Sequence, residues 1–130
     1  MNKGTIFLND AVLREVLNAH RPENVHLAKR HFYALILIAN GCCTSREISR
    51  AALMLKIAPS HTVDINVCLI DLKAAGLVMK RDDILTPYRG TSHAVVYCTL
   101  QGYNFIAMID NACDKILQRK MKRLLGDASL

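Results

Sequence analysis

The sequence feature that most limits the fold is an unbroken apolar run from Phe32 to Ala39. Its eight residues are far fewer than the roughly 20 that cross a bilayer, so insertion into a membrane is not expected. The run ends at Asn40-Gly41, a typical C-terminal stop for a helix. Because a helix that is apolar on all sides has to be buried, we expect a helix from about Val25 to Asn40 at the centre of the core.

The size and composition of the chain fit one globular domain around such a helix. Its 130 residues correspond to a single domain, residues 1–130, since domains commonly hold about 100–150 residues. Apolar residues make up 52% and charged residues 22%, which argues against a disordered chain. The net charge of +6 favours polyanionic partners such as nucleic acid. Residues Met1 to Thr5 do not begin a secretory signal, so the chain is expected in the cytoplasm.

Helical periodicity predicts four further helices around the central one. They span residues 9–20, about ten residues from Thr44 or Ser45, residues 61–75 and residues 100–125. In each, apolar residues recur every three or four positions, as one buried face requires. The inner faces of the middle two comprise Ile48, Ala51, Ala52 and Leu55, and Ile65, Cys68, Leu69 and Leu72. Gly76 is the expected C-terminal cap of the second of these.

Two short segments rich in Val and Tyr interrupt the helices. Leu77–Lys80 and Ala94–Thr99 are predicted β-strands. The residues between them, Arg81 to His93, contain Pro87 and Gly90 and are typical of a hairpin tip. The predicted fold class is therefore mainly α with a small β-hairpin.

Three local patterns accompany this order of elements. Residues 69–78 follow the pattern L-x-x-L-x-x-x-G-L-V, residues 45–53 form a short helix before it, and residues 97–102 lead from a strand through Thr99 into a helix. Together they resemble the winged helix-turn-helix of MarR- and PadR-like transcriptional regulators. The resemblance implies a winged-helix core at residues 25–102, with N- and C-terminal dimerisation helices at residues 9–20 and 100–125.

The resemblance also implies that the helix at residues 61–75 enters the major groove of DNA. Polar side chains near its N-terminus are then expected to reach base edges or phosphates; they are Ser60, His61, Thr62, Asp64 and Asn66. Asn66 has the chemistry to pair with adenine. For His61 and Thr62, capping of the helix N-terminus is an equally simple explanation.

Basic side chains expected to bind DNA phosphates lie outside that helix. They are Arg46, Arg50 and Lys56 on the preceding helix and turn, and Lys80, Arg81 and Arg89 in the hairpin. Arg89 beside Gly90 at the hairpin tip is the strongest single candidate, because such an arginine can enter a minor groove. The neighbouring acids Asp82 and Asp83 favour the alternative that Arg89 is a solvated loop charge.

The predicted recognition helix departs from the family in its outer face. Where regulators often carry Arg or Lys, this chain has Val63, Val67 and Ile70, and residues 57–79 have a net charge of −1 from Lys73 against two aspartates. Either the core extends around this stripe or the stripe joins a partner. The second possibility resembles the plasmid-partition winged-helix proteins known as TubR.

The terminal helices carry more apolar surface than a winged core of this size covers, which predicts a homodimer. The expected interface residues are Val12, Val16, Ile109, Cys113, Ile116 and Met121. A basic cluster on the last helix comprises Lys115, Arg119, Lys120, Lys122 and Arg123. A solvated face of a dimerising helix explains this cluster, and a direct DNA contact is the alternative.

Other chemistries find little support in the sequence. No nucleophile beside a base and no rigid pair of carboxylates is evident, so an enzyme is not expected. The five cysteines lack metal-ligand spacing, no cofactor is expected, and reduced buried thiols are the simplest explanation. Redox sensing by Cys42 or Cys43 near a helix N-terminus is the minor alternative.

The sequence therefore predicts a homodimer that binds double-stranded DNA sequence-specifically, most simply as a transcriptional repressor. The alternative is a plasmid or phage partition protein that binds a centromere, or a winged-helix adaptor that binds other proteins through the stripe at residues 63–70.

Overall fold

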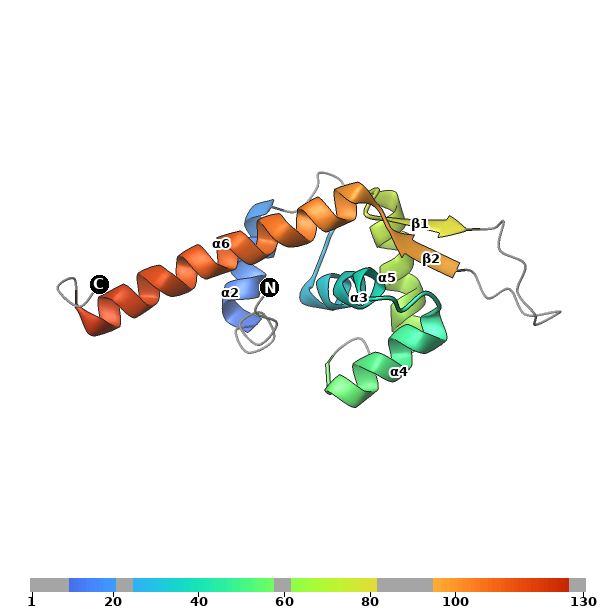
Figure 1. The fold of residues 1–130 in the computed structure, drawn as a ribbon, viewed down its shortest axis with the longest axis horizontal. Helices are drawn as coiled ribbons and strands as arrows, with labels where there is room; N and C mark the ends of the chain where they lie inside the picture. The colour runs from blue at the N-terminus through green and yellow to red at the C-terminus, as the bar shows by residue number, and fades with distance from the viewer. Residues whose placement is uncertain (1–9, 21–24, 58–61, 82–94, 127–130) are drawn as a thin grey trace.

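The computed structural model describes residues 10–20, 25–57, 62–81 and 95–126 (Figure 1). In chain order the elements are α2 (Asp10–His20), α3 (Lys29–Ala39), α4 (Ser45–Leu55), α5 (Thr62–Ala74), β1 (Val78–Arg81), β2 (Val95–Cys98) and α6 (Leu100–Leu125). The predicted mainly helical fold with a small hairpin is confirmed. Across these ranges, none of the helices has the length and apolarity that a membrane span requires.

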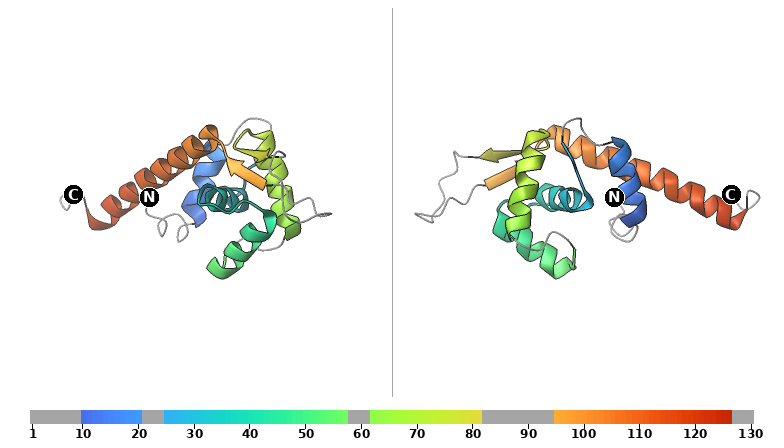
Figure 2. Two further views of the ribbon diagram at one scale, coloured as in Figure 1. Left: turned by 45° about the vertical axis from the view of Figure 1, so that its right-hand side comes forward. Right: turned by 180° about the vertical axis from the view of Figure 1, so that it is seen from behind.

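Helix α3 forms the centre of the core, as its apolar run predicts. Residues 31–38 are all buried, and α3 contacts α2, α4, α5, α6 and β2. Figure 2 shows it from two further sides, enclosed between α5 and the long helix α6. The predicted start at Val25 is wrong, because Ala28 is extended and its N–H donates to Nδ1 of His31 at 3.0 Å. The helix therefore begins at Lys29, four residues later than predicted.

Helices α4 and α5, which contact each other, are the two helices of the predicted helix-turn-helix. Thr44 caps α4 through its hydroxyl oxygen, which accepts the N–H of Glu47 at 3.2 Å, while the Glu47 carboxylate accepts the N–H of Thr44 at 3.1 Å. The placement of Leu55 on the inner face is wrong, since its side chain is 55% exposed. Helix α4 ends there because Lys56 turns to φ 55°, which brings Ile57 back toward the core instead.

The hairpin packs one of its faces on α5. Its strands are antiparallel, with Val78 opposite Cys98 and Lys80 opposite Val96, within one residue of the predicted bounds. Val78, Val96 and Cys98 are buried on the inner face, as the two-residue period of a strand requires. The Val96 N–H also donates to the Cys43 carbonyl at 2.8 Å, which ties the hairpin to the start of α4.

Helix α6 begins at the hairpin and extends past the rest of the protein (Figure 1). Its first half packs on the core through Phe105, Ile106 and Ile109, and Phe105 meets Phe32 edge to face with ring centroids 6.4 Å apart. Helix α2 lies against its middle. From Gln118 to Leu125 every side chain is exposed, so no other described segment of the chain covers this end.

The junction between the hairpin and α6 depends on one hydroxyl group. Thr99 Oγ1 accepts the N–H of Gly102 at 3.0 Å and donates to the Gly76 carbonyl at 2.8 Å. We expect Thr99→Ala to lower the free energy of unfolding by about 1.5 kcal/mol, because both bonds are lost. Thr99→Ser keeps the hydroxyl and is expected to stay within about 0.5 kcal/mol of the parent in urea unfolding. Equal losses for both variants would assign the effect to the γ-methyl group.

Candidate nucleic-acid interface

Helix α5 presents two faces of different character. Ile65, Cys68 and Leu72 are fully buried, as predicted for the inner face, and Leu69 is partly buried against the same core. On the outer face Val67 is 44% and Ile70 is 68% exposed. The possibility that the core extends around this stripe is therefore wrong for these two residues. The side chain of Val63 lies outside the part of the chain that the structure describes.

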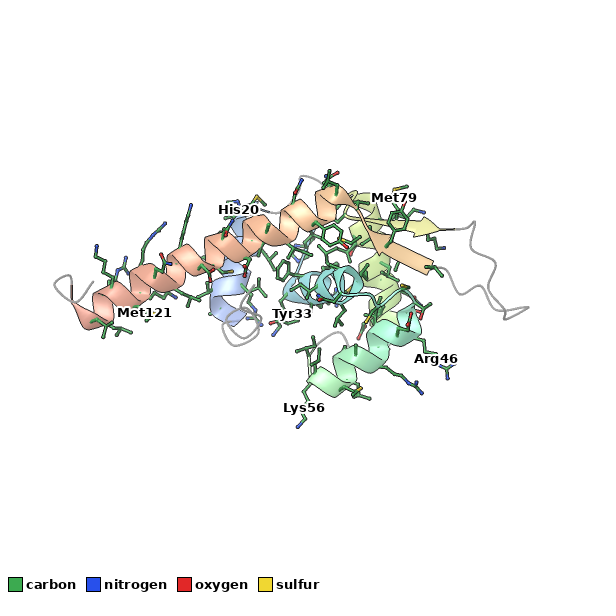
Figure 3. All side chains as sticks on the ribbon, viewed as in Figure 1. His20, Tyr33, Arg46, Lys56, Met79 and Met121 are labelled. Atoms are coloured by element: carbon green, nitrogen blue, oxygen red, sulfur yellow. The ribbon has the colours of Figure 1, made fainter. Side chains whose placement is uncertain are left out.

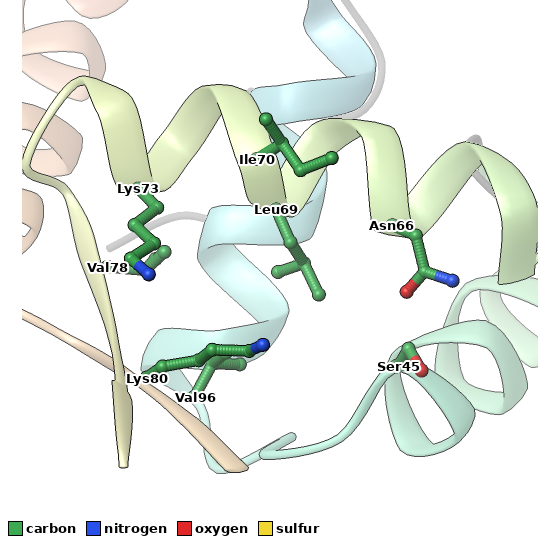
Figure 4. Close-up of a pocket in the computed structure, with 8 residues that line it drawn as sticks. All are labelled: Ser45, Asn66, Leu69, Ile70, Lys73, Val78, Lys80 and Val96. Atoms are coloured by element: carbon green, nitrogen blue, oxygen red, sulfur yellow. The ribbon is translucent and has the colours of Figure 1, made fainter. Parts of the chain in front are cut away.

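A groove lies between α5, the start of α4 and the hairpin (Figure 4). Its volume is about 410 Å³, and it is lined by Ser45, Asn66, Leu69, Ile70, Lys73, Val78, Lys80 and Val96. Leu69 points into the groove from α5, and the side chains of Lys73 and Lys80 extend into it from α5 and β1. Asn66 and Ser45 face each other across its other end. The groove thus combines two ammonium groups with an amide and a hydroxyl.

Further basic side chains lie on α4. Arg46 and Arg50 are exposed, and Arg46 points away from the protein at the start of the helix, while Lys56 lies at its opposite end (Figure 3). The one acid on this helix, Glu47, is held at its N-terminus by the N–H groups of Cys43 and Thr44, each at 3.1 Å. The exposed charges of α4 are therefore mainly cationic, and they share its surface with the exposed apolar side chains of Leu53, Met54 and Leu55.

The predicted DNA-binding residues fall into two groups. Those with described side chains are all exposed; they are Arg46, Arg50, Lys56, Asn66 and Lys80. Thr62 belongs to α5 and Arg81 to β1, but their side chains, and all of Ser60, His61 and Arg89, lie outside the description. Asn66 and Lys80 come together in the groove.

Sequence reasoning missed two residues of the groove, Ser45 and Lys73. Lys73 stands one turn after Leu69 and one turn before Leu77, a spacing that points toward the hairpin and could have placed it there. Ser45 is half-buried at the start of α4, where the sequence pattern indicates only a residue that initiates a helix.

A buried histidine connects α5 to the central helix. His31 is 1% exposed, its Nδ1 accepts the Ala28 N–H, and its Nε2 lies 2.8 Å from Oδ2 of Asp71 in α5. Because Nδ1 acts as an acceptor, the ring is neutral and Nε2 carries the hydrogen that it donates to Asp71. Burial lowers the pKa of His31, and the Asp71 carboxylate opposes this shift only in part.

The cysteines carry the chemistry expected of packing residues. All five are free, and burial raises the pKa of Cys68, Cys98 and Cys113 to about 11. Burial, together with the Glu47 carboxylate, also raises the pKa of Cys42, which disfavours the thiolate that redox sensing needs. Among the described residues, no group of three or more His, Cys, Asp or Glu side chains is placed to hold a metal ion.

The predicted dimer residues divide by burial. Val12, Val16, Ile109 and Cys113 are buried where α2 packs on α6 of the same chain, so their apolar surface is already covered. Ile116 is half-buried and lines a groove of about 600 Å³ between α2 and α6, and Met121 is exposed. Exposed large apolar side chains on α6 are Leu100, Tyr103 and Met108 in its first half, and Met121, Leu124 and Leu125 toward its C-terminal end.

No protein-family model matches the sequence, and neither does any curated protein. Solved structures match over most of the chain. Wild-type MarR from Escherichia coli in its apo form matches with a TM-score of 0.63 and 17% identity, covering 96% of this chain and 82% of that one. A Mycobacterium tuberculosis MarR family protein in complex with p-aminosalicylic acid matches with a TM-score of 0.56 and 18% identity, covering 97% and 93%.

A third match is NadR in complex with 4-hydroxyphenylacetate, with a TM-score of 0.56 and 20% identity over 98% of this chain and 82% of that one. These matches include the terminal helices as well as the helix-turn-helix and hairpin, because they cover nearly the whole chain. The chain therefore has the winged helix-turn-helix fold of the MarR-family structures.

Proposed function

We propose that this protein is a homodimeric transcriptional regulator that binds double-stranded DNA. The observation that carries the proposal is the exposed helix α5, set in the helix-turn-helix of a winged-helix fold and bordered by cationic side chains of α4 and the hairpin. In this proposal α5 enters the major groove while Arg46, Arg50 and Lys80 contact phosphates on either side. Structural neighbours described as a multiple antibiotic resistance repressor and as a MarR-family transcriptional regulator support repression as the mode of action.

The distribution of charge supports phosphate binding around α5 rather than by α5 itself. Helix α4 and its cap have Arg46, Arg50 and Lys56 against Glu47, a net +2, whereas α5 has Lys73 against Asp64 and Asp71, a net −1. Contacts with the phosphate backbone of the DNA fix the register of a winged-helix protein on the duplex. The helix that lies between these contacts then recognises the bases.

The dependence of binding on salt tests the DNA proposal. We expect the affinity for a random-sequence duplex, measured by fluorescence anisotropy, to fall steeply with salt, because bound phosphates release counterions. In the double variant Arg46→Ala/Arg50→Ala the log–log slope should become shallower by about 1.8, at roughly 0.9 per lost phosphate contact.

The matched control is Arg14→Ala/Arg30→Ala, which removes the same charge from exposed positions on α2 and α3. It should leave the slope close to that of the parent. Equal losses for the two pairs would mean that only total charge matters, and a weak, flat salt response of the parent would contradict DNA binding altogether.

Dimerisation is proposed through the groove between α2 and α6 and the exposed apolar end of α6. A mass of about twice the 14.5 kDa chain is expected by light scattering at micromolar concentration. Met121→Glu places a carboxylate on a 55% exposed apolar position of this surface and is expected to shift the mass toward the monomer. Met54→Glu, at an 82% exposed position on α4, is the control that should stay dimeric.

A partition or adaptor function is the second candidate, favoured by the exposed Val67 and Ile70 on α5. A protein that uses this surface to bind another protein has no need of a steep salt response on random duplex DNA. The salt titration therefore also separates the regulator from an adaptor that binds only protein, whereas a partition protein that binds a centromere would share the steep salt response.

A further inference from the structure

The outward face of α5 is apolar along its centre. At about 100° per residue, the positions opposite the buried Ile65 and Leu72 are Val67, Ile70 and Ala74, and all three are exposed. Polar side chains occupy only the two edges of this helix face. Asp71 lies on the edge toward α3, where His31 holds it, and the opposite edge faces the hairpin groove.

Such a face excludes most of the contacts by which helices read DNA. Val67 and Ile70 have no side-chain donor for phosphate oxygens or for the guanine acceptors O6 and N7. The apolar group that B-DNA displays in the major groove is the 5-methyl of thymine. A duplex rich in thymine therefore offers this face a complementary surface, whereas one of G·C pairs offers it only unpaired polar groups.

We propose, on the basis of the proposed function, that Val67 and Ile70 contact thymine methyl groups and that the protein selects sites with A·T pairs at these positions. Asn66, exposed at the hairpin edge of the same helix, then pairs with the N6 and N7 atoms of an adenine. The ligand of the outer face of α5 is thus a run of adjacent A·T pairs.

The dimensions and charges around α5 suit a DNA groove. A helix about 10–12 Å wide fills a major groove about 12 Å wide. Val67 and Ile70 are three residues apart, which places them about 4.5 Å apart along the axis, close to the spacing of roughly 3.4 Å between base pairs. Lys73 and Lys80 lie in the groove beside the stripe, and Arg46 and Arg50 lie on α4. On this side of the stripe the cationic border favours a polyanion over an ordinary apolar protein surface, whereas the opposite edge of α5 carries the carboxylates of Asp64 and Asp71.

The test uses full-length protein and the duplex that it selects best from a random library. Deoxyuridine replaces thymidine at one position at a time, which removes the methyl group and keeps every hydrogen-bonding atom. Each contacted thymine should cost about fourfold in affinity, the value expected for one buried methyl group. In Val67→Ala and Ile70→Ala, the ratio of affinities for the thymidine and deoxyuridine duplexes should fall toward one at the position that each residue contacts.

Leu53→Ala is the matched control, since Leu53 is an exposed apolar residue on α4 rather than α5. It should keep the full preference for thymidine. Equal binding of thymidine and deoxyuridine duplexes by the parent protein would overturn the methyl contact while leaving DNA binding intact. Failure to bind any duplex, with the stripe capturing a protein instead, would overturn the proposed function and this inference with it.

Discussion

Replacing Gly102 by alanine is expected to lower the free energy of unfolding by about 3 kcal/mol, the upper end for overpacking a core. A Cβ at this position would lie 2.3 Å from the Leu77 carbonyl oxygen and 2.7 Å from Sγ of Cys98. The carbonyl cannot move away freely, because it also accepts the Thr99 N–H at 3.1 Å. Glycine is therefore required where α6 crosses the start of the hairpin.

The direction of this effect is informative, because helix propensity alone predicts the opposite. Alanine is favoured over glycine inside a helix by about 1 kcal/mol. The control Asn104→Ala lies two residues further along α6 on an exposed position and should leave stability unchanged or slightly raised. Urea unfolding followed by circular dichroism measures both variants. A Gly102→Ala protein as stable as the parent would mean that α6 does not approach Leu77 so closely.

The elements with local signals could be predicted from the sequence. The run from Phe32 to Ala39 needs burial in any fold, and α3 is buried accordingly. Gly76 has the positive φ, +76°, that its predicted role as a C-terminal cap requires. The Leu77 N–H donates to the Leu72 carbonyl at 3.0 Å, which completes that cap. Each of these signals depends on a few neighbouring residues, so no knowledge of the tertiary fold is needed.

Which apolar faces pack against each other could not be predicted. Periodicity indicates that a helix face is buried, but it does not indicate which element buries it. The stripes containing Val16 and Ile109 are each predicted to meet a partner, yet in the structure α2 and α6 cover them within the chain. On α5 the same ambiguity has the opposite outcome, since Val67 and Ile70 stay exposed. The candidate site therefore depends on tertiary packing that a single sequence does not encode locally.

The role of His31 could not be predicted from the sequence, because this polar residue directly precedes an apolar run and its partner lies far away along the chain. Only the fold brings Asp71, 40 positions away in the sequence, to its Nε2. We expect Asp71→Ala to lower the free energy of unfolding at pH 8 by about 2 kcal/mol, because it leaves a buried N–H without an acceptor. Asp71→Asn keeps an acceptor at this position and is expected to cost less than about 1 kcal/mol. Equal losses would show that the charge, rather than the hydrogen bond, matters.

The pH dependence of stability follows from the same contact. The pKa of His31 in the folded protein lies below its ordinary value of 6.5, because burial disfavours the charged ring and Arg30 and His26 add to this effect. At pH values between the folded pKa and 6.5 the unfolded chain therefore binds the proton more readily than the folded protein does. The stability that neutral His31 contributes is fully present above pH 6.5 and falls as the pH drops below it. Protonation also removes the Nδ1 acceptor that caps α3.

Asp71 raises the pKa of His31, so removing its carboxylate should lower that pKa further and make the loss of stability on acidification larger. Urea unfolding at pH 8 and at pH 5.5 is expected to give a greater difference for Asp71→Ala than for the parent. In His31→Gln, which does not titrate, the difference should shrink to the contribution of the remaining groups. If all three proteins lost the same stability between these pH values, His31 would not be the group that titrates, and its buried, neutral state would be contradicted.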